Sequence, residues 1–122
     1  MVTWVMVLVG GALGAVCRFG ITWLVERHDR PTPWGTFAAN LTGSFLLGLL
    51  GGLGGALPGW VAALLGTGFC GALTTWSTFA YESVRLARSG PSGRTRALLN
   101  VAATLGLGFG AATVGWLLGR WL

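Results

Sequence analysis

Four long apolar stretches, separated by three polar connectors, make up almost all of this 122-residue chain. They run over residues 2–25, 34–57, 60–84 and 97–118, and each holds 22 to 25 residues. A helix of that length crosses the roughly 30 Å of hydrocarbon in a bilayer. The pattern therefore predicts an all-α membrane protein in which residues 1–122 form a single domain of four transmembrane helices.

The connectors predict how these helices are oriented. They are ERHDRPTP (26–33), Pro58-Gly59 and RLARSGPSGRTR (85–96), and the shortness of the second predicts a tight hairpin between the second and third helices. Six arginines lie in the first and third connectors, whereas the opposite side carries only Arg120. Because positive loops stay in the cytoplasm, we expect a multi-pass protein of the cell (inner) membrane with both termini outside.

The composition supports the membrane class and excludes others. The chain is 53% hydrophobic and 9% charged, whereas an average soluble domain is about 25% charged. Its net charge of +5 comes from eight arginines that do not gather on one helical face, so we expect no nucleic-acid partner. The single histidine, His28, lies in a connector and no Ser/His/Asp set is present, so we do not expect an enzyme. The 22 glycines lie mostly within the apolar stretches, which is typical of closely packed membrane helices.

Polar residues inside the apolar stretches are the candidates for function, because such groups are costly in lipid. Arg18, near the end of the first stretch, either extends to the cytoplasmic face or provides a positive potential for an anion vestibule. Asn40 either joins helices or donates hydrogen bonds to an ion. Asn100 and Thr104 form a further polar pair in the fourth stretch.

The segment LTTWSTFAYE (73–82) holds the densest polar cluster: Thr74, Thr75, Ser77 and Thr78, with Trp76 among them and Phe79 next. The hydroxyls could simply bond to carbonyls four residues back. Together with nearby glycines, however, they favour a third helix that is broken mid-membrane, which lipid tolerates only where the backbone is buried or lines a cavity. Carbonyls freed there could bind a cation, and N–H and hydroxyl groups an anion. Glu82 lies three residues before Arg85, and we expect a local ion pair between them.

Three segments resemble the CrcB/Fluc family of fluoride channels: GGALGAVCRFG (10–20), PWGTFAANLTGSFLLG (33–48) and GFCGALTTWSTFAYE (68–82). The resemblance extends over essentially the whole chain and is loosest in the fourth stretch. It implies a four-helix subunit with a broken third helix, pairing as an antiparallel dimer with two fluoride pathways along the interface. It also implies a central structural sodium ion.

The resemblance assigns roles to residues of this chain. Backbone carbonyls of Gly71 and Thr74 would hold the sodium ion. The fluoride pathway would include Asn40, ring edges at positions 76 and 79, and a polar track on the fourth helix, for which Asn100 and Thr104 are the candidates. We add the hydroxyls of Thr75, Ser77 and Thr78 to the pathway and Arg18 to its vestibule. The family commonly has Phe where this chain has Trp76.

The expected function is a fluoride-selective channel that lets fluoride leave the cytoplasm and so lowers its toxicity. One alternative is a non-conducting or obligate partner subunit of a heteromeric channel, because the six-to-one arginine bias favours a single orientation over dual topology. The chain would then pair with an oppositely oriented homologous subunit instead of with itself. A small multidrug-type proton-coupled exchanger is a further alternative, but it needs an embedded carboxylate on the first helix. The only acid there, Glu26, lies at the end of that helix.

Overall fold

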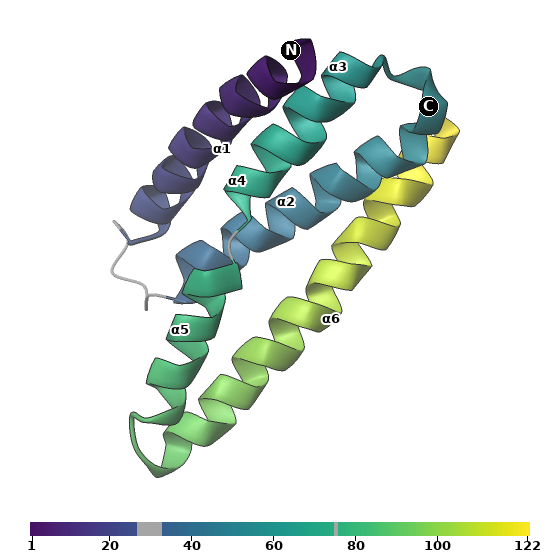
Figure 1. Cartoon of the computed structure of the whole chain (residues 1–122). Coiled ribbons are helices and arrows are strands. Elements are labelled where there is room, and N and C mark those ends of the chain that lie inside the picture. Colours follow the sequence, from purple (N-terminus) through teal and green to yellow (C-terminus); the bar gives the residue numbers. More distant parts are fainter. Residues whose placement is uncertain (27–32, 75) are drawn as a thin grey trace.

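The computed structural model describes residues 1–26, 33–74 and 76–122, leaving out the side chains of Glu26, Pro33, Trp76 and Ser77. The described residues form helices and connections, with no strand among them (Figure 1). In chain order the elements are α1 (Val2–Glu26), α2 (Pro33–Leu53), η1 (Gly54–Ala56), α3 (Gly59–Val61), η2 (Ala62–Cys70), α4 (Gly71–Leu73), α5 (Trp76–Ala87) and α6 (Pro91–Trp121).

Three helical spans within the described residues are long and apolar enough to cross a membrane: Val2–Val25, Trp34–Ala56 and Pro91–Trp121. Few apolar side chains are buried, and Leu73 is the only large one that is fully enclosed among the described residues. Large apolar side chains instead point outward along α1 and α6, such as Leu8, Leu13 and Phe109. An apolar exterior of this extent fits hydrocarbon and not water, so the chain is a multi-pass membrane protein.

The third apolar stretch forms two helical segments. The first comprises α3, η2 and α4 and runs without a gap from Gly59 to Leu73, with wide turns over Ala62–Cys70. At Thr74 the backbone becomes extended (φ −81°, ψ 152°), and α5 begins at Trp76. Figure 1 shows α4 and α5 as separate helices, and among the described residues of the 74–78 cluster Thr74 alone is not helical.

The last helix is longer than the sequence pattern predicts. We expected a connector over residues 85–96, but α5 continues to Ala87 and α6 already begins at Pro91, so that prediction was wrong. Arginine is a good helix former, so the basic residues extend both helices. Proline suits the first helical turn, and Gly90 precedes it with φ 124°, a backbone conformation that glycine readily adopts.

Glycines allow the helices to pack with their backbones in contact. α2 lies along α6, and α1 lies along η2 and α4 (Figure 1). A Cβ atom added at Gly48 would overlap the carbonyl oxygen of Ala112 on α6, and one added at Gly10 would overlap that of Leu64 on η2. Close packing of this kind is how membrane helices gain van der Waals contact without a hydrophobic driving force.

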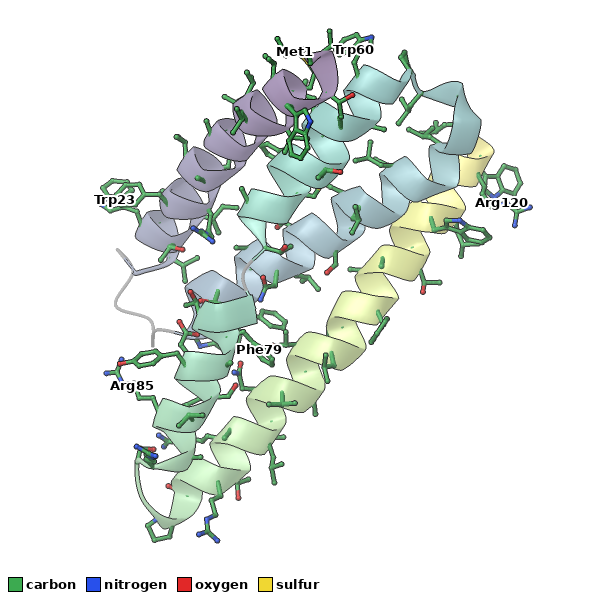
Figure 2. All side chains as sticks on the ribbon, viewed as in Figure 1. Met1, Trp23, Trp60, Phe79, Arg85 and Arg120 are labelled. Atoms are coloured by element: carbon green, nitrogen blue, oxygen red, sulfur yellow. The ribbon has the colours of Figure 1, made fainter. Side chains whose placement is uncertain are left out.

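Both chain termini lie at the end of the molecule that holds the α2–α3 connection, and the α5–α6 connection lies at the opposite end (Figure 1). The two ends differ in charge. Arg85, Arg88, Arg94 and Arg96 are exposed at the α5–α6 end. Arg120 lies at the other end, with its guanidinium 4.7 Å from the ring centre of Trp116 (Figure 2).

Candidate functional site

An open groove of about 680 Å³ runs between α2 and α6 and reaches the α4–α5 junction. It brings together four of the residues singled out in the sequence: Asn40 from α2, Thr74 after α4, Phe79 from α5 and Thr104 from α6. Ser44 and Thr113 are the other polar side chains in its lining, and the remaining walls are apolar or glycine. The groove is therefore a mostly apolar surface with a few hydrogen-bonding groups.

The hydroxyl groups of two groove threonines are engaged by the backbone. Thr74 Oγ1 donates to the carbonyl oxygen of Cys70 at 3.0 Å, and the Thr74 N–H donates to the same oxygen. Thr113 Oγ1 likewise donates to the Phe109 carbonyl at 2.8 Å. The back-bonding interpretation is therefore correct for Thr74, whose hydroxyl closes the last turn before the backbone becomes extended.

Thr104 is different. Its Oγ1 atom is buried and has no hydrogen-bond partner among the described residues. A buried hydroxyl without a partner costs roughly 1–3 kcal/mol, so such groups in native proteins usually receive a ligand, a water molecule or another chain. Thr104 is therefore the buried groove residue whose hydroxyl lacks a hydrogen-bond partner within the described part of the chain.

Phe79 and Asn100 are linked through Ser83. The Phe79 side chain is 5% exposed and lies between α5 and α6 (Figure 2). Ser83 Oγ donates to the Phe79 carbonyl oxygen at 2.9 Å and accepts a hydrogen bond from Asn100 Nδ2 at 3.2 Å. Asn100 thus joins α6 to α5 and is not among the residues that line the groove.

Glu82 is buried, and a residue of another helix binds its carboxyl group. Only 6% of the residue is exposed, and its Oε1 accepts a hydrogen bond from Thr36 Oγ1 of α2 at 2.9 Å, whereas Arg85 is exposed. Burying a carboxylate is costly without hydrogen-bond donors, which explains why it has a hydroxyl partner. A carboxyl group therefore lies within the helix packing, whereas the Glu82–Arg85 ion pair stays a prediction.

The other predicted site residues lie outside the groove or outside the described part of the chain. Arg18 is half-buried on α1, and Thr78 is exposed on α5. Gly71 is exposed, with no atom within 4 Å of an added Cβ. Thr75 lies outside the described residues, as do the side chains of Trp76 and Ser77.

Sequence reasoning missed Thr36, Ser44 and the buried position of Glu82. A signal was present for the first two: Thr36, Asn40 and Ser44 are spaced four apart, so they share one face of α2. No local signal marks the Thr36–Glu82 contact, which joins residues 46 positions apart.

Comparison with known proteins identifies the family. Residues 5–116 match the family described as "CrcB-like protein, Camphor Resistance (CrcB)". The chain is 48% identical to "Fluoride-specific ion channel FluC 1" of Frankia casuarinae, with 96% of this chain and 95% of the relative covered. It is 45% identical to the FluC 1 channel of Streptomyces avermitilis (92% and 91% covered) and to the FluC 2 channel of Bacillus subtilis (93% and 85% covered). The chain therefore belongs to the CrcB family.

Proposed function

We propose that this protein is a fluoride-selective ion channel of the cell membrane that lets fluoride leave the cytoplasm and so lowers its toxicity. The observation that carries the proposal is the near full-length similarity to relatives that bear the name fluoride-specific ion channel. Those relatives are channels and not enzymes. A proton-coupled exchanger is no longer an alternative, because the chain belongs to the CrcB family. The first helix also lacks the embedded carboxylate that such an exchanger needs.

The groove between α2 and α6 would form one wall of the pathway. Fluoride is small and strongly hydrated, so an apolar pore must replace its lost water with hydrogen-bond donors. Asn40 carries two amide N–H donors, Thr104 offers a hydroxyl without a partner among the described residues, and the buried Phe79 ring presents a weakly positive edge. In this proposal Trp76 supplies a second ring edge, and Thr75, Ser77 and Thr78 are further hydroxyl donors.

Positive charge near the groove favours an anion. Trp116 lines the groove, and the Arg120 guanidinium lies over its ring. A positive charge therefore lies at the Trp116 end of the groove. Arg18 would add positive potential to a vestibule on the opposite side. Neither charge needs to touch the ion, because in a medium of low dielectric constant the attraction extends over several ångströms.

We propose further that the segments Gly59–Leu73 and Trp76–Ala87 together make one interrupted crossing, which gives four crossings in all. The extended backbone at Thr74 supports this proposal. The last carbonyls of a helix have no intrahelical partner, so we expect those that follow Cys70 to be available to a ligand, whereas the Cys70 oxygen already accepts from Thr74. An interruption of this kind in lipid needs a partner surface or an ion to satisfy it.

A structural sodium ion fits these carbonyls. Hard cations take oxygen ligands, and the described residues contain no cluster of three His, Cys, Asp or Glu side chains that could hold a metal ion instead. Gly71 is exposed on the subunit surface and close in sequence to Thr74, so the carbonyls of both residues could face a second subunit. When bound, the ion would supply positive charge and hold two subunits together, and its ligands would be the Gly71 and Thr74 carbonyls of each.

The channel would be an antiparallel dimer, either with a second copy or with an oppositely oriented homologous subunit. The large apolar exterior leaves room for such an interface. The arginines gathered at the α5–α6 end favour one orientation, with that end in the cytoplasm. One orientation for every copy is hard to combine with antiparallel pairing of identical chains, so the partner-subunit alternative stays open.

Fluoride efflux from proteoliposomes tests the proposal. Vesicles loaded with potassium fluoride and containing this chain alone are treated with valinomycin, and a fluoride electrode records release. Rapid release that protein-free vesicles do not show supports a channel formed by this chain. Release only after an oppositely oriented homologue is co-reconstituted would support the heteromeric alternative, and no release in either case would overturn the function.

A further inference from the structure

Ser44 lies in the groove but has no role in the function proposed above. It follows Asn40 by one turn of α2 and is half-buried. Gly108 lies opposite on α6, and a Cβ atom added there would come within 3.6 Å of Ser44 Oγ. The Ser44 hydroxyl therefore faces a part of α6 that carries no side chain, and the space in front of it is open to the groove.

Only some of the hydroxyls in this groove can donate to a ligand. Thr74 and Thr113 donate to carbonyl oxygens within their own helical segments. Ser44 has no hydrogen bond within the described part of the chain, and the buried Thr104 Oγ1 lacks a partner there too. Ser44 faces Gly108, and Thr104 precedes Gly108 by one turn of α6. The hydroxyls of Ser44 and Thr104 therefore lie on opposite walls of the groove, about one turn apart.

Thr104 lies level with Asn40, because Ser44 faces Gly108 and Gly48 contacts Ala112 on helices that run in the same direction, and Ser44 lies one turn farther along the groove. From Asn40 to Ser44 the chain moves along α2 toward the α2–α3 connection, and from Thr104 to Gly108 it moves along α6 toward the C-terminus. The α2–α3 connection and the C-terminus lie at the same end of the molecule (Figure 1). The Ser44 hydroxyl would therefore continue the hydrogen-bonding route from Asn40 and Thr104 toward that end.

We infer that Ser44 is a fluoride-coordinating residue, whose hydroxyl donates to the ion one helical turn beyond Asn40 and Thr104. This inference rests on the proposed function and assigns a binding step to it. Hydroxyl donors suit a small anion with a high charge density, because an O–H···anion contact is short and can replace a water molecule of the hydration shell. Gly108 leaves the space that the ion needs beside Ser44.

Three full-length variants test the role of Ser44 by fluoride efflux at several fluoride concentrations. Ser44→Ala removes the donor, and Ser44→Thr keeps it. Thr42→Ala is the matched control: Thr42 is exposed on the same helix, does not line the groove and donates its hydroxyl to the Ala38 carbonyl at 2.7 Å. A hydrogen bond to a charged group is strong enough that we expect Ser44→Ala to lower the flux at least about tenfold. We expect Ser44→Thr and Thr42→Ala to stay within about twofold of the unmodified protein.

Gly108→Ala tests the same contact from the other wall. The added methyl group fits at van der Waals distance but covers the Ser44 hydroxyl, so flux should fall while Ser44 is still present. If Gly108→Ala and Ser44→Ala act on one contact, the fluoride flux of the double variant should fall by a smaller factor than the product of the two single-variant factors.

The outcomes separate this inference from the function on which it rests. If the unmodified chain releases no fluoride, the proposed function fails. If it conducts and Ser44→Ala conducts equally well, the function stands and the role of Ser44 is overturned. The role is also overturned if Ser44→Ala and Ser44→Thr lose flux equally, because the hydroxyl would then not be the property that matters. Matching elution profiles from size-exclusion chromatography confirm that each variant is folded.

Discussion

Thr36 of α2 donates a 2.9 Å hydrogen bond to the buried carboxyl group of Glu82 on α5. This contact joins the helix that carries Asn40 to the helix that begins just after the extended backbone at Thr74. A second link, from Asn100 to Ser83, ties the same segment to α6. The position of Phe79 in the groove therefore depends on polar contacts from two neighbouring helices.

The Thr36–Glu82 contact should be important for stability. Thr36→Val keeps the shape of the side chain but removes the donor, so the buried Glu82 carboxyl loses that hydrogen bond. We expect a loss of roughly 1–3 kcal/mol, seen as a lower midpoint of thermal unfolding in detergent. Thr42→Ala is the control, because the hydroxyl of Thr42 is exposed. An unchanged midpoint for Thr36→Val would show that the contact adds little.

Asn40 should be required for conduction because of its amide donors. Asn40→Asp keeps the size of the side chain and replaces the N–H groups with a second oxygen, which repels an anion when ionised. Fluoride efflux should fall by roughly a hundredfold or more, as expected when a charge-assisted hydrogen bond becomes a repulsion. Flux close to that of the unmodified protein would remove Asn40 from the pathway.

Positions 76 and 79 should each keep fluoride flux when one aromatic ring replaces another, but not when the ring is removed. Trp76→Phe replaces the indole with a smaller aromatic ring that still has a positive edge, and we expect it to keep fluoride flux. Complete loss in the efflux assay would show that the indole has a specific task.

Phe79→Ile provides the complementary test, because it keeps an apolar side chain of similar bulk and removes the positive ring edge. We expect a clear loss of fluoride flux with little change in the unfolding midpoint. If flux persists, the buried Phe79 ring serves packing and not the ion.

The backbone contact between α2 and α6 should be sensitive to a single methyl group. A Cβ atom at Gly115 would overlap the Phe45 carbonyl oxygen, whereas one at Gly106 on the same helix meets nothing within 4 Å. Gly115→Ala should therefore cost about 1–3 kcal/mol, the range for overpacking, and Gly106→Ala should be neutral or slightly stabilising. Equal unfolding midpoints for the two variants would contradict the observed packing.

The sequence predicted the parts of this structure that depend on composition and on isolated polar residues. The apolar stretches predicted membrane helices because their length and hydropathy are independent of tertiary packing. Asn40 and Thr104 could be found because a polar side chain in an apolar stretch is easily noticed. Helix ends were less predictable, since the arginines of residues 85–96 are good helix formers and α6 begins at Pro91.

The contacts of the site depend on tertiary structure, so the sequence did not reveal them. Arg85 was predicted as a partner of Glu82 because it is near in sequence, but the hydrogen bond from Thr36, 46 residues away, could not be found in that way. In the sequence Ser44 resembles an ordinary small helix residue, because nothing there shows that it faces Gly108. Asn100 stays a predicted pathway residue, and the sequence did not show that its amide also donates to Ser83. Whether a hydroxyl is free to bind an ion depends on its neighbours, which a single sequence does not show.

Selective release of fluoride tests the central claim most directly. Vesicles that contain this chain alone are loaded with equal amounts of potassium fluoride and potassium chloride, and electrodes for both ions record release after valinomycin is added. We predict that fluoride leaves rapidly while chloride stays inside until detergent is added. Release of both ions together, or of neither, would contradict a fluoride-selective channel formed by this chain.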